Sequence, residues 1–87
     1  MKLNKNFVLR QVADTWVVLP IGEASINFYG MLTLNESGAM LWRVLEQNGD
    51  RDALIEALIR EYTVDIETAA SDVDAFLNKL INAGCVL

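Results

Sequence analysis

The first third of the chain carries short runs of β-branched and aromatic residues, whereas the remainder carries apolar positions at helical spacing. Residues 7–13 and 15–19 are runs of the first kind, and only Asp14 separates them, so they predict a tight antiparallel hairpin. Apolar and polar positions alternate over residues 26–33, which predicts a third strand. In a three-stranded meander this strand lies at an edge, so half of its backbone hydrogen-bonding groups have no partner within the sheet.

Three helices are predicted after the strands, and a short polar residue marks where each one begins. Asn35, Asp50 and Asp65 are N-cap candidates, because their side-chain oxygens can accept a free N–H of the first turn. Gly49 is expected to supply the left-handed residue that ends the first helix, and Gly84 ends the third. The predicted helices cover about residues 36–48, 51–62 and 66–83.

The helical segments each carry an apolar face. On the first helix and just before it, the residues that share a face are Leu34, Gly38, Leu41, Trp42 and Leu45. The face of the second consists of Leu54, Ile55, Leu58, Ile59 and Tyr62. The third has a wider one, made of Ile66, Ala69, Ala70, Val73, Phe76, Leu77, Leu80 and Ile81. We expect both tryptophans in the core, where the indole N–H of Trp42 needs an acceptor. Residues 1–6 are expected to be a loose start.

This order of elements predicts an α+β fold of the winged helix-turn-helix type, with a three-stranded antiparallel sheet over about 7–33 followed by three helices. At 87 residues the chain is long enough for one small domain, 1–87. Its hydrophobic fraction of 53% is high, so either the packing is dense or apolar surface is kept for a partner.

Charge and cysteine content narrow the possible functions. The net charge of −5 disfavours nucleic acid, whose binding depends on Lys and Arg meeting phosphates. Cys85 is the only cysteine, so no internal disulfide forms and the chain suits a reducing cytoplasm. No apolar run approaches the roughly 20 residues that span a bilayer, so no membrane partner is expected.

The residue types in the sequence do not favour a catalytic function. The chain has no histidine, which is the commonest general base and metal ligand. Cys85 is read as a buried small hydrophobe. The pairs Asp50/Asp52 and Asp72/Asp74 are spaced i, i+2, which points their carboxylates to different sides of a helix. We therefore expect no enzyme activity, no metal and no cofactor.

A winged helix-turn-helix suggests DNA binding by analogy, but the charges of the third helix argue against it. In this layout it is the recognition helix, and it carries Glu67, Asp72 and Asp74 against Lys79. Tyr29 and Met31 lie opposite the apolar set of the third strand. They form either a partly covered surface or a contact surface for an incoming peptide.

Three stretches of the sequence resemble the PqqD-like family. They are the opening Phe-Val-Leu-Arg, the central Asn-Phe-Tyr-Gly-Met-Leu-Thr-Leu-Asn-Glu-Ser-Gly-Ala-Met-Leu-Trp, and Glu-Tyr-Thr-Val-Asp before the long helix. Members of this family are also called RiPP recognition elements. They are the peptide-recognition domains of pathways that make ribosomally synthesised, post-translationally modified peptide natural products.

The resemblance implies a non-catalytic module that binds the leader segment of a precursor peptide. The leader would add as a fourth strand to the third strand and lie along the third helix. Its modifying enzyme would be a radical SAM protein, a cyclase or a leader peptidase. Carried over by position, the binding residues would be Asn27, Phe28, Tyr29, Gly30, Met31, Leu32 and Thr33, with outward positions Asp72, Ala75, Phe76, Lys79 and Leu80.

A structural or dimerisation module remains the alternative, in which the third strand or third helix pairs with its twin. The oligomeric expectation is accordingly a monomer or a weak homodimer.

Overall fold

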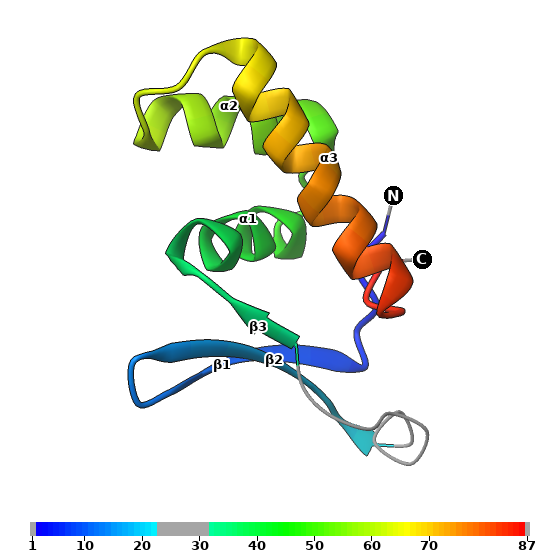
Figure 1. The fold of residues 1–87 in the computed structure, drawn as a ribbon. Coiled ribbons are helices and arrows are strands. Elements are labelled where there is room, and N and C mark those ends of the chain that lie inside the picture. The colour runs from blue at the N-terminus through cyan, green and yellow to red at the C-terminus, as the bar shows by residue number, and fades with distance from the viewer. Residues whose placement is uncertain (1, 23–31, 87) are drawn as a thin grey trace.

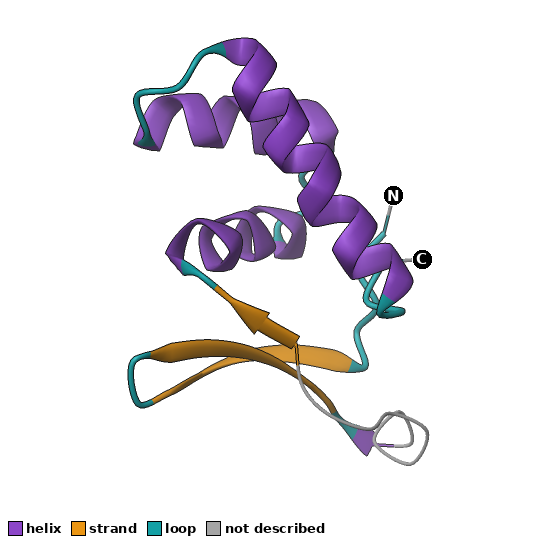
Figure 2. Cartoon of the chain, in the orientation of Figure 1, coloured by secondary structure: helices purple, strands orange, loops and turns teal. Residues whose placement is uncertain are grey.

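The structure is a computed structural model that describes residues 2–22 and 32–86. An antiparallel sheet with strand order β1–β2–β3 lies beside three helices, which confirms the predicted α+β winged helix-turn-helix (Figures 1 and 2). The strands are β1 (Phe7–Val12), β2 (Thr15–Pro20) and β3 (Leu32–Leu34). The helices are α1 (Glu36–Glu46), α2 (Arg51–Glu61) and α3 (Ile66–Asn82). Each helix ends one or two residues before its predicted end.

The hairpin of β1 and β2 has the two-residue turn that the sequence suggests. Val12 lies opposite Thr15, and the turn residue Ala13 has a φ of 55°. A left-handed turn residue matches the right-handed twist of the two strands. The hairpin therefore supplies the rigid base on which β3 pairs.

All three predicted N-caps are confirmed. The side chain of Asn35 accepts from the N–H of Gly38 at 2.8 Å, and that of Asp50 accepts from Ala53 at 2.9 Å. Asp65 accepts from the N–H of Thr68 at 2.7 Å. Each bond satisfies a backbone donor that has no partner within its helix.

The end of α1 corrects one prediction. The left-handed residue is Asn48, with a φ of 66°, and not Gly49. The N–H of Gly49 returns to Val44 O at 2.9 Å and that of Asn48 to Leu45 O at 3.0 Å, which is a Schellman motif. A glycine is needed at position 49 because its backbone lies close to that of Val44: a Cβ there would lie 2.8 Å from Val44 O. Gly84, with a φ of 80°, ends α3 as predicted.

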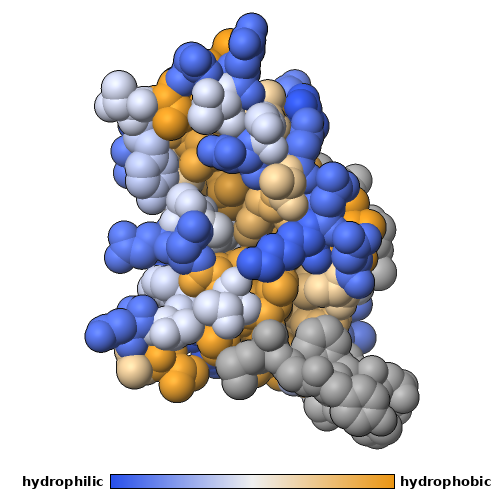
Figure 3. Space-filling view, in the orientation of Figure 1, coloured by the Kyte–Doolittle hydropathy of each residue, from blue (hydrophilic) through white to orange (hydrophobic). Residues whose placement is uncertain are grey.

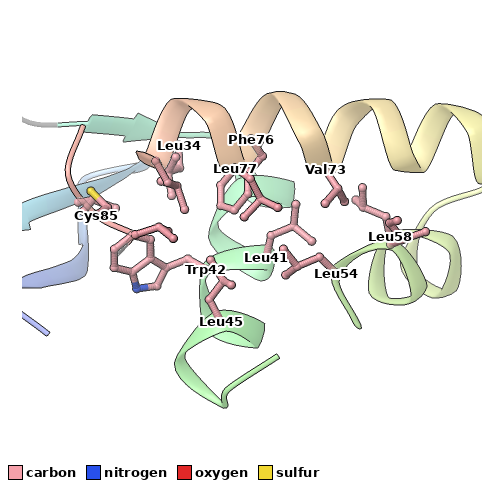
Figure 4. Packing of buried hydrophobic residues seen from close by; sticks show 14 of the residues in the cluster. Leu34, Leu41, Trp42, Leu45, Leu54, Leu58, Val73, Phe76, Leu77 and Cys85 are labelled. Atoms are coloured by element: carbon pink, nitrogen blue, oxygen red, sulfur yellow. The ribbon is translucent and has the colours of Figure 1, made fainter. Parts of the chain in front are cut away.

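The core is one cluster that joins the sheet to all three helices (Figure 4). The predicted face of Leu34 and α1 is buried throughout, and Trp42 is 0% exposed at its centre. Among the described residues, no acceptor lies within hydrogen-bonding distance of the Trp42 Nε1. Trp16 is only half-buried, and the guanidinium of Arg43 lies 4.5 Å from its ring centroid. The expected burial of Trp42 is confirmed, the expected acceptor for its N–H is not found among the described residues, and the expectation for Trp16 is only partly correct.

The apolar faces of α2 and α3 are narrower than predicted. Their exposed members, at 40–66% of full exposure, are Ile59, Tyr62, Ile66 and Ile81. Three of the four lie near the turn between α2 and α3, at the end of the helical layer remote from the sheet (Figure 1). The sheet is too distant to cover them there.

The N-terminal segment pairs with the C-terminal segment, in contrast to the predicted loose start. Leu3 forms an antiparallel bridge with Val86, and it packs against the core. Asn4 donates its N–H to Cys85 O at 2.7 Å and its side-chain amide to Gly84 O at 3.1 Å. These contacts close the fold next to the end of α3. Pairing with the C-terminal segment is the reason that the prediction of a loose start was wrong for Leu3 and Asn4, whereas residue 1 lies outside the described residues.

Candidate functional site

A groove of about 380 Å³ opens where β3 runs into α1, with α3 as its opposite wall. That volume lies at the small end of the range for ligand pockets, roughly 300–1,000 Å³. The residues that line it are Leu34, Asn35, Ser37, Gly38, Leu41, Leu58, Asp72, Ala75, Phe76 and Lys79. Figure 3 shows hydrophobic surface between α1 and α3, with hydrophilic residues around it.

The groove has an apolar floor and a polar rim. Leu34, Leu41 and Phe76 come from β3, α1 and α3, and their side chains converge beneath α3 (Figure 4). The polar groups of the rim belong to Asn35, Ser37, Asp72 and Lys79. Asn35 and Ser37 are fixed by the helix cap, since the Ser37 hydroxyl donates to Asn35 Oδ1 at 2.9 Å. Such a site suits an apolar side chain carried on a polar backbone.

The predicted helix residues fall into two groups. Asp72, Ala75, Phe76 and Lys79 all line the groove, as their spacing along one side of α3 allows. Leu80 does not: it is 0% exposed within the core. Phe76, although it lines the groove, is only 9% exposed, so the prediction of both as outward residues was wrong. At the i+4 position from Phe76, Leu80 follows the inner edge of the helix toward the sheet. A role of the four lining residues in peptide contact stays a prediction.

The predicted strand residues are only partly described. Asn27, Phe28, Tyr29, Gly30 and Met31 lie outside the described residues. Leu32 is half-buried against the core, and Thr33 is exposed. Six lining residues were not among the predicted binding residues: Asn35, Ser37, Leu58, Leu34, Gly38 and Leu41, of which the last four were expected only as part of an apolar face. The first two belong to the cap at the strand-to-helix junction, where a polar cap beside an open strand edge was the available signal.

The free edge of β3 is defined by the strand register. In an antiparallel pair, residues that exchange backbone hydrogen bonds alternate with residues that do not. Counted from the pair Val12–Thr15 that closes the turn, Val17 directs its backbone groups at β1. Thr33 lies opposite Val17 and therefore directs its N–H and C=O away from β2, at the edge of the sheet. Lys79 Nζ donates to this Thr33 oxygen at 3.0 Å.

The carboxylates of α3 act separately, as their spacing predicts. Asp74 accepts from Arg51 Nε at 2.7 Å, whereas Asp72 lines the groove. The hydrogen bond from Arg51 lowers the pKa of Asp74, and the same bond raises the pKa of Arg51. Asp72 is thus left on the groove wall without an ion pair among the described residues.

Cys85, the residue with nucleophilic potential, lies outside the groove lining. Cys85 is buried at 0% exposure, and burial raises the pKa of its thiol to about 11. Within residues 2–22 and 32–86, no group of three His, Cys, Asp or Glu side chains is placed to hold a metal ion. In the same part of the chain, no helix is long and apolar enough to cross a membrane.

Comparison with known proteins gives a family and a structural neighbour. The sequence model of the family described as "Coenzyme PQQ synthesis protein D (PqqD)" matches residues 15–86. Among solved structures, the chain is similar to "TbiB1 in Complex with the TbiA(beta) Leader Peptide", with a TM-score of 0.80 and 26% sequence identity. That similarity covers 99% of this chain and 94% of the other. No curated protein matches the chain.

Proposed function

Because the chain belongs to the PqqD family, we propose that it binds the leader segment of a ribosomally synthesised precursor peptide and presents it to a modifying enzyme. The observation that carries this proposal is the groove beside β3, which is the edge strand of the sheet formed by the described residues, with α3 as the other wall. An exposed sheet edge beside an apolar groove fits an extended peptide, which adds as a strand and places alternate side chains in the groove. The similar structure, which is a complex with a leader peptide, supports the same proposal.

Backbone pairing alone does not give a tight complex. A few new hydrogen bonds contribute about 0.5–1.5 kcal/mol each, and ordering a flexible peptide offsets most of that. One or two apolar leader side chains on the floor formed by Leu34, Leu41 and Phe76 would add about 1.5–3 kcal/mol each if fully buried. Both affinity and selectivity therefore come mainly from the apolar leader side chains that enter the groove.

The module itself is proposed to be non-catalytic and to act without metal or cofactor. Cys85 is held as a buried thiol, and the groove wall offers Asp72 as its acidic group and Lys79 as its basic one. The chemistry would be done by the partner enzyme, such as a radical SAM protein, a cyclase or a leader peptidase. A free thiol suits the reducing cytoplasm, where we place the complex.

Two proline substitutions test strand addition. Thr33→Pro removes the edge N–H of β3, and proline is tolerated at an edge where no ladder bond is lost. By the same register, Gln11 of β1 directs its N–H at the opposite edge, so Gln11→Pro is the matched control. The probes are fluorescent copies of peptides selected on the wild-type protein from a random display library, with affinity measured by anisotropy.

We expect Thr33→Pro to weaken peptide binding about fivefold or more, as for the loss of one backbone hydrogen bond. Gln11→Pro should bind within about twofold of wild type, and far-UV circular dichroism should show both variants folded. Equal affinity of the two folded variants would refute docking on β3.

A homodimer formed through the same edge is the second candidate, because an unpaired edge strand also invites pairing with its twin. Sedimentation equilibrium with and without the selected peptide separates the two functions. A monomer that binds one peptide supports the leader-binding module. A stable dimer that the peptide does not dissociate favours dimerisation.

A further inference from the structure

Lys79 crosses the groove from α3 to the edge of the sheet. Its ammonium donates to the carbonyl oxygen of Thr33 at 3.0 Å, although the two residues are 46 positions apart in the chain. Within Leu32–Leu34, Thr33 is the residue whose backbone groups face the free edge. Lysine is one of the residues with which natural proteins protect exposed strand edges. The ammonium thus covers the edge carbonyl next to the groove.

An incoming strand competes with Lys79 for that carbonyl. A peptide that continues the sheet donates backbone N–H groups to the edge carbonyls of β3. Thr33 is the described carbonyl that such a strand meets beside the groove, and the lysine already occupies it. Because Lys79 is exposed, water hydrates the withdrawn ammonium, so its withdrawal costs only the net contribution of one hydrogen bond. A carboxylate replaces that bond with a stronger one, because it is a better acceptor than a carbonyl.

Charge on the groove wall favours a carboxylate at one end. Lys79 is the cationic residue of the described lining and Asp72 is the anionic one. They are seven positions apart, so along α3 they are separated by about 10 Å. A carboxylate near Lys79 gains an ion pair, whereas one near Asp72 meets a like charge. The wall therefore distinguishes the two ends of a bound peptide.

We propose that Lys79 is a displaceable plug on the edge of β3, and that the leader carries an acidic side chain which draws the ammonium off Thr33. This rests on the proposed leader-binding function and adds to it a selectivity rule. The acidic side chain opens the edge and pairs with Lys79, and the freed carbonyl then accepts from the leader backbone. A leader without that acid binds against a blocked edge.

A plug and a simple ion pair give different results when Lys79 is removed. For an acidic peptide, Lys79→Met weakens binding in both cases, because the ion pair is lost. For the same peptide with its acid changed to the neutral amide, a simple ion pair predicts no effect of Lys79→Met. A plug predicts tighter binding, because the variant leaves the Thr33 carbonyl open.

The experiment uses peptides selected on the full-length protein from a random 14-residue display library. The most enriched acidic peptide and its Glu→Gln or Asp→Asn counterpart are titrated against wild type, Lys79→Met and Arg60→Met. Arg60 is the control, since it is an exposed cation on α2 outside the groove lining. Its pairing with Glu56 is an exposed i, i+4 contact whose loss has little effect.

We expect Lys79→Met to weaken the acidic peptide about two- to fivefold and to tighten the neutral peptide about two- to tenfold. Arg60→Met should leave both affinities unchanged. No gain for the neutral peptide, or selected peptides with no acidic residue at a fixed position, would overturn the plug. Failure of the wild-type protein to enrich any peptide would refute the leader-binding function, and the plug with it.

Discussion

Arg51 in the first turn of α2 donates two hydrogen bonds to the carboxylate of Asp74 in α3, from Nε at 2.7 Å and from Nη2 at 3.0 Å. This planar, two-bond geometry is the one that arginine and carboxylate groups favour. It links α2 and α3 between residues 23 positions apart, on a side of α3 outside the groove lining. The pair is roughly half exposed, so its role is to orient the helices more than to stabilise them.

Acid should destabilise the fold through specific carboxylates. The backbone N–H of Thr68 lowers the pKa of Asp65, and the hydrogen bond from Arg51 lowers that of Asp74. In the folded state the pKa of each carboxyl lies below its ordinary value of 3.8, so each ionised carboxylate stabilises the fold above pH 3.8. This stability is lost as the pH falls through the pKa of the folded state. We expect urea midpoints to decline below about pH 4. Asp65→Asn, which keeps a capping oxygen, should reduce that slope; an unchanged slope would contradict this origin.

Alkali should destabilise the fold through Cys85. Burial raises the pKa of this thiol from 9.0 to about 11, so the unfolded chain loses its proton first. The stability from this thiol is therefore present below pH 9 and is lost between pH 9 and about 11. Cys85→Ala should show a shallower decline in this window than wild type when urea midpoints are compared. Parallel curves for the two proteins would show that other groups cause the decline.

Trp42 should be the most costly core residue to truncate. Its side chain is 0% exposed, so Trp42→Ala should lower the free energy of unfolding by about 3–5 kcal/mol. Trp42→Phe should cost less than half as much, because it fills most of the space and removes an N–H that has no acceptor among the described residues. Urea denaturation of the two variants measures the difference. Equal losses for the two variants would contradict the prediction, because they would mean that the phenyl ring recovers none of the packing of Trp42.

The end of α1 makes a paired prediction about its two turn residues. Gly49→Ala should destabilise by about 1–3 kcal/mol, because the new Cβ would lie 2.5 Å from Val44 Cγ1 and 2.8 Å from Val44 O. Asn48→Gly should be neutral or slightly stabilising, since its φ of 66° suits glycine. Thermal melts of both variants test the assignment. A large loss for Asn48→Gly with none for Gly49→Ala would restore Gly49 as the left-handed residue.

Local sequence signals predicted the elements well, because the forces that set them are local. The N-caps are Asn35, Asp50 and Asp65, and each cap depends only on the first turn of its own helix. The hairpin around Asp14 likewise depends only on residues next to it in the sequence. The error at Gly49 arose because two adjacent residues can each end a helix. Only the approach to Val44 shows which property of glycine is used there.

The groove was less predictable, because it depends on how separate elements meet. The sequence places Phe76 and Leu80 on one helical face. In the folded chain Phe76 lines the groove, whereas Leu80 is 0% exposed within the core. Leu58 joins the lining only because α2 packs behind α3. The hydrogen bond between Lys79 and Thr33 joins residues 46 positions apart, so no local pattern of charge in the sequence predicts it.

The bridge between Leu3 and Val86 has a practical consequence for engineering. The two ends of the fold lie side by side at the foot of α3 (Figure 1). A linker of a few residues can join them at a small entropic cost, because the ends are already close. The chain can then be circularly permuted with new termini at the exposed turn of Ala13 and Asp14, or inserted as a cassette into a surface loop of a host enzyme. In either arrangement the tether would leave from the bridged ends or the hairpin tip, and the groove lining would keep its chain connections.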